Sequence, residues 1–242
     1  RMREHYQEFV DTYPGSNRMP EAVYWVGWTY LNEDEPEKAK QIYWDVIEKY
    51  GDDPDRHTVA DVFSALPKVY KQDGDAGREE LLTRLERMKA GAENEGRHTL
   101  ALRSAWTKSQ IIGKTSPSVA KAELLAAANA GWINPKEQNP MLTVEVAEAL
   151  LEAGNLLTAK EMLLEIRKWH PRAVQKDRIF AALGTIAAEQ GEPELAIDYY
   201  ERFEREAATS TRLGEVQIQK ARLLADQGKA AEARATLESV LE

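Results

Sequence analysis

A spacing of 37 residues recurs along the 242-residue chain and limits its possible folds more than any other feature. Small residues, turn glycines and aromatic residues keep this spacing independently of one another. The positions that keep it are Ala147, Gly184 and Ala221; Gly154, Gly191 and Gly228; Ala122, Ala159, Ala196 and Ala233; and, near the N-terminus, Tyr6 and Tyr43. Because these separate sets agree on one period, the sequence predicts a repeat array.

Each repeat unit reads as two helices joined by a short turn. In residues 20–32 the apolar stripe follows helical spacing, with members Val23, Val26, Gly27 and Tyr30. Pro36 suits the first position of a second helix, where a missing N–H is harmless. That helix is predicted to stop at Gly51, with Pro54 beyond it. We expect the small residue in each first helix to let the two helix backbones approach closely.

These residues resemble the tetratricopeptide repeat (TPR) pattern W-x2-L-G-x2-Y, then A-x3-F, then P. The matching positions are Val23, Val26, Gly27, Tyr30, Ala39 and Tyr43; Thr143, Val146, Ala147, Leu150, Ala159, Leu163 and Pro171; and Phe180, Leu183, Gly184, Ala187, Ala196 and Tyr200. A weaker last copy keeps Ala221, Leu224, Ala233 and Leu237. The resemblance implies an all-α fold, a right-handed α-solenoid of antiparallel helix pairs with about 13 helices.

We expect residues 1–242 to form a single TPR-like superhelical domain. Its predicted parts are a half-repeat at 1–17, a repeat at 18–54, degenerate pairs at 55–96 and 97–135, and repeats at 139–171, 174–208 and 210–242. Pro67 lies inside an apolar stripe and is expected to kink or break that helix. Met2 aligns with Ala39 of a second helix, so we expect the chain to be a fragment of a longer protein.

The phrases YPGSNRMPEAVYWVGWTY and EKYGDDP are similar to the longer repeats of bacterial cell-envelope TPR proteins. Those proteins include the periplasmic partner of the Tol-Pal system and the lipoprotein of the outer-membrane β-barrel assembly machine. This resemblance favours the periplasm or cell envelope of a bacterium over the cytoplasm.

The charge balance and the hydropathy pattern exclude several classes of partner. The formal net charge is −9, whereas a protein that binds nucleic acid usually presents a basic face. An RNA-reading helical repeat is disfavoured for the same reason. No apolar run approaches the roughly 18–20 residues that a membrane helix needs, so no membrane insertion is expected. The chain has no cysteine, which excludes disulfides and thiolate metal sites.

We find no pattern of residues typical of catalysis or of cofactor binding. The histidines do not follow a metal-binding spacing; they are His5, His57, His98 and His170. Motifs for nucleophilic serine, phosphate loops and dinucleotides are absent from the sequence. The acidic run 33–37 lacks the alternating ligands and central glycine of a calcium loop, and a helix-start turn explains it better. We therefore expect no enzyme activity, no cofactor and no metal.

The resemblance to TPR proteins also implies where a partner binds, because their first helices line a concave groove. Carried over position by position, the candidate partner-binding residues are Tyr24, Trp28, Leu31, Asn32, Glu148, Arg178, Thr185 and Arg222. The chaperone-binding subfamily clamps a carboxylate with Lys, Asn and Arg at the second and sixth positions. Here the first full unit has Glu21 and Trp25 at those positions, so no carboxylate clamp is expected.

The aromatic residues of the first full unit leave two interpretations open. Tyr24, Trp28 and Leu31 form a second helical stripe that points toward the groove, yet a helix with neighbours on both sides is apolar over a wide arc. Trp25 and Trp28 are therefore either packing or binding residues. Two further tryptophans, Trp44 and Trp169, lie off their main stripes and are candidates for packing against the next unit.

The leading hypothesis is a non-enzymatic scaffold that binds a protein or peptide in the concave groove of a TPR solenoid. The alternative is a helical regulatory or accessory domain of a larger multidomain enzyme or envelope machine. Neither hypothesis identifies the partner, because solenoid grooves are read by surface detail.

Overall fold

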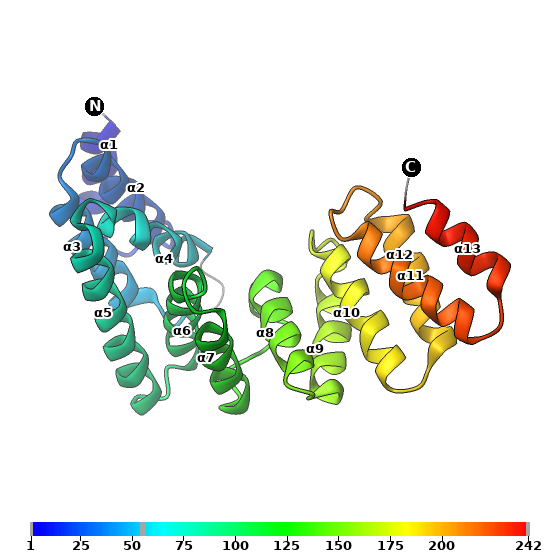
Figure 1. The fold of residues 1–242 in the computed structure, drawn as a ribbon. Helices are drawn as coiled ribbons and strands as arrows, with labels where there is room; N and C mark the ends of the chain where they lie inside the picture. The colour runs from blue at the N-terminus through cyan, green and yellow to red at the C-terminus, as the bar shows by residue number, and fades with distance from the viewer. Residues whose placement is uncertain (1, 54–56, 241–242) are drawn as a thin grey trace. The chain divides into compact units, whose positions relative to one another are not determined.

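The computed structural model describes residues 2–53 and 57–240, and every regular element within them is helical (Figure 1). These residues form thirteen α-helices and one 3₁₀ helix, which confirms the predicted all-α class and helix number. In the part of the chain so described, no helix combines the length and apolar character needed to cross a bilayer. The predicted stop signal at Pro54 and the predicted boundary between residues 54 and 55 lie outside the described residues.

The helices fall into two compact units, Arg1–Ile133 and Asn134–Glu242. The first contains α1 (Met2–Thr12), α2 (Met19–Asn32), α3 (Pro36–Tyr50), α4 (His57–Val69), the 3₁₀ helix η1 (Tyr70–Asp73), α5 (Gly74–Asn94), α6 (His98–Ile112) and α7 (Pro117–Asn129). The second contains α8 (Pro140–Glu152), α9 (Leu156–Trp169), α10 (Lys176–Glu189), α11 (Pro193–Glu206), α12 (Leu213–Asp226) and α13 (Ala230–Glu238). The expectation of one domain over residues 1–242 stays a prediction.

The turns inside the helix pairs of the second unit share one backbone device. Gly154, Gly191 and Gly228 have φ values of 80°, 75° and 77°. The residue after each glycine donates its N–H to a carbonyl of the preceding helix, as Asn155 does to Leu150 at 2.8 Å. Glycine adopts this left-handed conformation without steric strain, so the 37-residue spacing of these glycines follows a backbone requirement. In the first unit Asp34 takes this place, with φ 62°.

The small residues of the first helices do allow close approach of the second helix. A Cβ atom at Gly27 would overlap the ring of Tyr43, and a Cβ atom at Gly184 would overlap the ring of Tyr200. Both tyrosines are buried, and they occupy equivalent positions of their repeats. The tyrosine ring thus fills the space that the missing side chain leaves, and this contact joins the two helices of each pair.

Gly51 ends α3 where predicted, but not by the left-handed geometry of a usual glycine cap. Its φ is −62°, which any residue adopts. A Cβ atom at Gly51 would instead overlap the carbonyl oxygen of Ile47 in α3 and the side chain of Leu100 in α6. The glycine therefore leaves space for the last turn of α3 and for the approach of α6.

Pro67 lies inside α4, and its effect appears just after it. The α-helix ends at Val69 and continues directly as the 3₁₀ helix η1, after which Gly74 with φ 60° begins α5. Proline removes one backbone donor and crowds the preceding turn, which favours a change of helix type close by. The degenerate pair therefore has no loop between its helices, and α5 extends over 21 residues.

The two tryptophans predicted to pack against a following unit behave differently. Trp44 is fully buried, its indole N–H donates to the hydroxyl of Tyr70 at 3.0 Å, and the Arg84 guanidinium lies 4.3 Å from its ring. This confirms packing of α3 on the next helix pair. Trp169 is 42% exposed, and its indole N–H donates to Glu165 of its own helix at 2.5 Å. Packing of Trp169 against the next unit stays a prediction.

A network of ion pairs holds together the part of the chain that matches the repeat least. Lys108 of α6 pairs with Glu86 of α5 at 2.6 Å and with Glu123 of α7. Lys89 of α5 pairs with both carboxylates, each at 3.0 Å. Three of these four side chains are largely shielded from solvent, so screening by salt is reduced there. The network joins three helices across two pairs.

Candidate functional site

The first helices of the repeats lie next to one another within each unit. In the first unit α2 packs beside α4 and α4 beside α6, and in the second unit α8 packs beside α10. The predicted binding residues lie on these helices in two groups: Tyr24, Trp28, Leu31 and Asn32 on α2, and Glu148 on α8, Arg178 and Thr185 on α10, and Arg222 on α12. Each unit thus carries its own candidate surface.

Aromatic side chains from three helices form a continuous cluster in the first unit. We name Tyr6, Tyr24, Trp25, Trp28 and Tyr43 the aromatic cluster. Trp25 is at its centre: the ring of Tyr6 in α1 stacks on it at 6.2 Å, while Tyr24 and Trp28 meet it edge-on at 5.3 and 5.7 Å. Tyr24 in turn stacks on Tyr43 of α3 at 5.8 Å. Such pairs stabilise the arrangement beyond simple burial.

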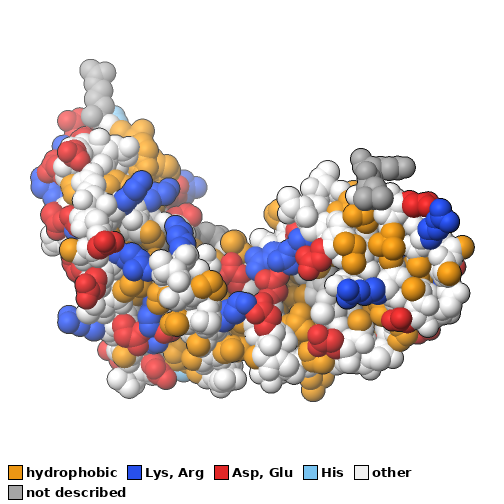
Figure 2. Space-filling view, viewed as in Figure 1, with side chains coloured by type: hydrophobic (Ala, Val, Ile, Leu, Met, Phe, Trp, Pro, Cys, Tyr) orange, Lys and Arg blue, Asp and Glu red, His pale blue; other side chains and the backbone are white. Residues whose placement is uncertain are grey.

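The members of the cluster differ in how much they face solvent. Tyr43 is fully buried, Tyr24 and Trp25 are half-buried, and Trp28 is 38% exposed. Burial raises the pKa of Tyr24, and the nearby carboxylate of Asp61 in α4 raises it further. Figure 2 shows hydrophobic side chains at the surface over the α1–α2 end of this unit. Trp25 therefore packs between helices, whereas Trp28 presents part of its ring to solvent.

The other two predicted residues of α2 complete this surface. Leu31 is half-buried, and Asn32 is exposed, with its side-chain amide donating to the carbonyl of Trp28 at 2.7 Å. We call Glu21, Tyr24, Trp28, Leu31 and Asn32 the α2 face. It is a rigid aromatic surface with a polar residue at each end.

Trp28 occupies a position where the second unit has Thr185. The residue 157 positions after Trp28 is Thr185, just as Tyr200 follows Tyr43 by 157 positions. Tyr200 is hydrogen-bonded to Thr185, whose hydroxyl donates to the carbonyl of Ala181 at 3.1 Å. The buried hydroxyl of Tyr43 has no hydrogen-bond partner among the described residues. Trp28 therefore stands where a threonine could form a hydrogen bond with the buried tyrosine hydroxyl.

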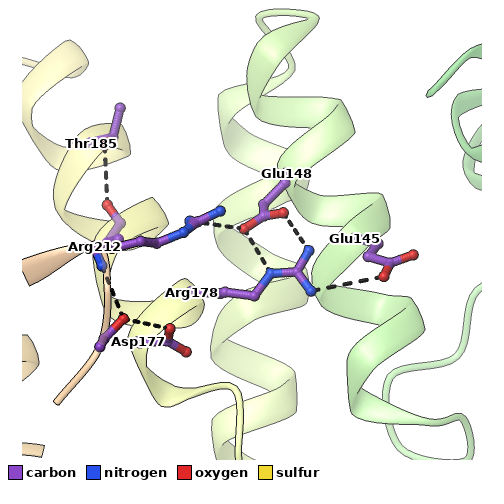
Figure 3. Close-up of polar contacts among 8 residues, drawn as sticks. Glu145, Glu148, Asp177, Arg178, Thr185 and Arg212 are labelled. Atoms are coloured by element: carbon purple, nitrogen blue, oxygen red, sulfur yellow. Dashed lines mark hydrogen bonds and ion pairs between the residues drawn. The ribbon is translucent and has the colours of Figure 1, made fainter. Parts of the chain in front are cut away.

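In the second unit a carboxylate on α8 holds arginines from the two following repeats (Figure 3). Glu148 accepts from Nε of Arg178 at 3.1 Å and from its terminal nitrogen at 2.5 Å. Arg212, which precedes α12, reaches the same carboxylate at 3.3 Å. Glu145 lies 3.8 Å from Arg178 on the other side. A bidentate pair of this kind fixes both side chains in one geometry.

The environment of this ion cluster keeps it charged and ordered. The hydrogen bonds that Arg178 donates to Glu148 raise the pKa of Arg178, and burial opposes that shift. Below it, Ser210 donates to Asp177 at 2.9 Å and accepts from the backbone N–H of Arg212 at 3.3 Å (Figure 3). The structure thus brings Glu148 and Arg178 together, and each satisfies the other. Their geometry is that of a brace between repeats.

Arg222 on α12 is one of the exposed predicted residues. Its side chain is exposed and makes no ion pair with the part of the chain that the structure describes. Ile218, one turn earlier on the same helix, is 41% exposed. Met141 on α8 is 39% exposed. The second unit therefore offers isolated apolar side chains rather than a continuous aromatic surface.

The carboxylates of the acidic run after α2 bind other side chains of the same chain. Each carboxylate has its own partner: Glu33 pairs with Arg3, Asp34 accepts from Gln72, Glu35 pairs with Lys38, and Glu37 pairs with Lys40. The run closes a turn and joins neighbouring helices. Over residues 2–53 and 57–240 no three His, Asp or Glu side chains converge in a way that fits a metal ion.

A hollow along α5 was missed by the sequence reasoning. It has a volume of about 860 Å³ and lies between the end of α3, one face of α5 and the start of α6. Ala76, Thr83 and Gly91 of α5 are among the residues that line it, as are Glu48 and Arg84, which pair 3.8 Å apart. The hollow depends on the length of α5. That length could not be read from the sequence, because it results from η1 taking the place of a loop.

Comparison with known proteins finds one family model and several solved structures of low sequence identity. Residues 21–53 match the family model described as tetratricopeptide repeat. No curated protein matches the chain. Among solved structures, a tetratricopeptide repeat protein from Parabacteroides merdae is 13% identical with a TM-score of 0.48, and covers 98% of this chain and 79% of its own. The pilF protein of Pseudomonas aeruginosa is 16% identical with a TM-score of 0.40, over 91% of this chain and 100% of its own.

Proposed function

We propose that this chain, whose residues 21–53 match the tetratricopeptide repeat model, is a non-enzymatic scaffold that binds a segment of a protein partner on the α2 face. Repeats of this kind generally serve protein interaction, and their stacked helices present extended binding surfaces. The proposal concerns the first unit, where α2, α4 and α6 lie side by side.

One observation carries this proposal: Trp28 is 38% exposed, while its ring packs edge-on against that of Trp25 at 5.7 Å. Large aromatic side chains that are already ordered lose little entropy on binding, and they dominate the energetics of many interfaces. Trp28 also occupies the position at which Thr185 serves the buried Tyr200 in the second unit. A residue that leaves Tyr43 without its partner is not explained by stability, and this supports a role in recognition.

The residues of the second unit have a different role in this proposal. Glu148 and Arg178 fix the spacing of successive first helices, because each saturates the other. Thr185 supports the core through Tyr200. We assign partner contact there to Arg222 alone, and we place the main binding surface on α2.

The test is a selection of peptides of random sequence against the immobilised chain, followed by affinity measurements with variants. We expect Trp28→Ala to weaken the selected peptides by about tenfold or more, as for an interface hot spot. Trp169→Ala is the matched control, because that tryptophan is similarly exposed. Circular dichroism should show both variants to be as helical as the wild type.

Two results would overturn the proposal. Peptides that bind the wild type and Trp28→Ala equally would remove the α2 face as the site. A Trp28→Ala variant that unfolds would show that this tryptophan belongs to the core.

A further inference from the structure

Several aromatic rings in this chain form cation–π contacts with lysine or arginine side chains of the same chain. The pairs are Arg3 and Lys38 with Tyr30, Lys40 with Tyr70, Lys49 with Tyr50, Arg84 with Trp44, Lys136 and Lys168 with Trp169, Arg167 with Phe180, and Arg202 with Tyr199, at 4.3 to 5.9 Å from the ring centroids. Cations are attracted to the negative face of an aromatic ring. The exposed Trp169 in particular is covered by two lysines.

The aromatic residues of the α2 face are not among these pairs. Among the residues that the structure describes, no lysine or arginine lies over Tyr24 or Trp28. The charged side chains beside them are carboxylates instead. Glu21 lies three residues before Tyr24 and seven before Trp28, hence on the same side of α2. Asp61 of the adjacent α4 is close enough to Tyr24 for its charge to raise the pKa of the tyrosine.

These two carboxylates are accessible to a cation from a partner. Glu21 and Asp61 are exposed, and neither forms an ion pair with a described residue. By contrast, Glu33 at the end of α2 pairs with Arg3, whose guanidinium lies over the ring of Tyr30. Among the described residues, the α2 face and the neighbouring Asp61 thus combine an exposed ring and two carboxylates without an ion pair, and no lysine or arginine lies over the ring.

On the basis of the function proposed above, we propose that the α2 face binds an arginine side chain of the partner segment, stacked on Trp28 and paired with Glu21 and Asp61. A planar guanidinium stacks on an aromatic face and forms directed hydrogen bonds with carboxylates at the same time. The compact, strongly hydrated ammonium of lysine suits the stacking less well.

Charge argues for this occupant over the alternatives. An acidic segment would be repelled by Glu21 and Asp61, and a purely apolar one would bury their carboxylates without partners. The net charge of −9 favours approach of a basic segment over long range. Lys68, seven residues after Asp61 on α4 and exposed, marks where a second arginine would be disfavoured.

The experiment uses the intact chain and two synthetic peptides. One is acetyl-Gly-Arg-Gly amide, and the other replaces arginine by citrulline, which has the same shape without the charge. Nitrogen-15 NMR follows the indole N–H signals of the six tryptophans, and Trp28→Phe assigns the signal of interest. We expect the arginine peptide to shift the Trp28 signal and leave that of Trp169 in place.

Variants then test the carboxylates. Asp61→Asn and Glu21→Gln preserve shape and should each weaken binding of the arginine peptide, while Asp45→Asn on the exposed side of α3 should not. The citrulline peptide should bind at least about tenfold more weakly than the arginine peptide, and the difference should shrink as salt is raised.

The outcomes separate this inference from the function on which it rests. Equal shifts with arginine and citrulline, or binding unaffected in the Glu21→Gln, Asp61→Asn double variant, would overturn the arginine site and leave peptide binding on α2 intact. The same holds if selected peptides perturb Trp28 but the arginine peptide does not. If no peptide perturbs Trp28, both proposals fail.

Discussion

The ring of Tyr43 lies against the backbone of Gly27 so closely that no side chain fits between them. Tyr200 lies against Gly184 in the same way, 157 residues later. The two helix pairs that match the repeat best therefore share one packing rule. A glycine in the first helix leaves a space, and a tyrosine ring of the second helix fills it.

Gly27→Ala is therefore expected to destabilise the first unit. In an open helix alanine is better than glycine by about 0.5–1 kcal/mol. Overpacking at the tyrosine opposes this with about 1–3 kcal/mol. We expect a net loss of about 1–2 kcal/mol, measured by urea unfolding.

Gly91→Ala is the matched control in the same unit. Gly91 lies inside α5, and a Cβ atom there would meet open space. This variant should be more stable than the wild type by about 0.5–1 kcal/mol. A Gly27→Ala variant as stable as Gly91→Ala would contradict the packing argument.

Much of the fold could be predicted because the repeat rests on local backbone and size rules. The left-handed turn at Gly191 and the gap at Gly184 each need one residue type, so they recur at a fixed spacing and can be read in the sequence. The continuous path from α4 through η1 into α5 breaks those rules, and its long α5 was not predicted.

The candidate site was less predictable because it depends on side-chain pairing between helices. Position alone marked both Trp28 and Arg178 as groove residues. Only coordinates show that Arg178 is saturated by Glu148, whereas Trp28 is open to solvent. The pairing depends on small rotations of α8 and α10, which periodicity does not define.

The brace between Glu148 and Arg178 is expected to contribute measurably to stability. A double-mutant cycle with Glu148→Gln and Arg178→Met should give a coupling energy of about 1–2 kcal/mol, as for partly buried charged hydrogen bonds. Arg178→Lys should lose most of this coupling, because lysine cannot form the bidentate pair. Arg222→Met, at an exposed and unpaired position, should change stability by less than about 0.5 kcal/mol. A coupling near zero would contradict the assignment as a brace.

The ion network of α5, α6 and α7 predicts a specific pH dependence. Burial alone would raise the pKa of Glu86, but hydrogen bonds from Lys108 and Lys89 outweigh it, and the pKa is lowered. A lowered carboxyl pKa stabilises the fold at pH values above the unfolded value of about 4.3, and this contribution is lost as the pH falls through the folded pKa.

Glu86→Gln should therefore be less stable than the wild type at pH 7. Because the side chain of Glu86 is 48% exposed, the loss should stay below about 1 kcal/mol. The difference should shrink as the pH falls below about 4.3 and disappear below the lowered folded pKa, in urea titrations at several pH values. Glu80→Gln, at an exposed position of the same helix, serves as the control. A difference between wild type and Glu86→Gln that does not shrink as the pH is lowered would contradict this account.

The equivalent tyrosines predict opposite effects for one chemical change. Tyr200→Phe removes a hydroxyl that is hydrogen-bonded to Thr185 and should cost about 1 kcal/mol. Tyr43→Phe removes a buried hydroxyl that has no partner among the described residues, so it should leave stability unchanged or raise it by up to about 1 kcal/mol. Urea unfolding of both variants measures the contrast.

The contrast should depend on residue 28 if the comparison between repeats is correct. In the Trp28→Thr background the tyrosine hydroxyl gains the partner that Thr185 supplies in the second unit, so Tyr43→Phe should now cost about 1 kcal/mol. The same Trp28→Thr change should abolish peptide binding on the α2 face, because it removes the exposed ring. Stability and recognition would then oppose each other at a single position. An unchanged effect of Tyr43→Phe in that background would show that Trp28 does not displace a hydrogen-bond partner.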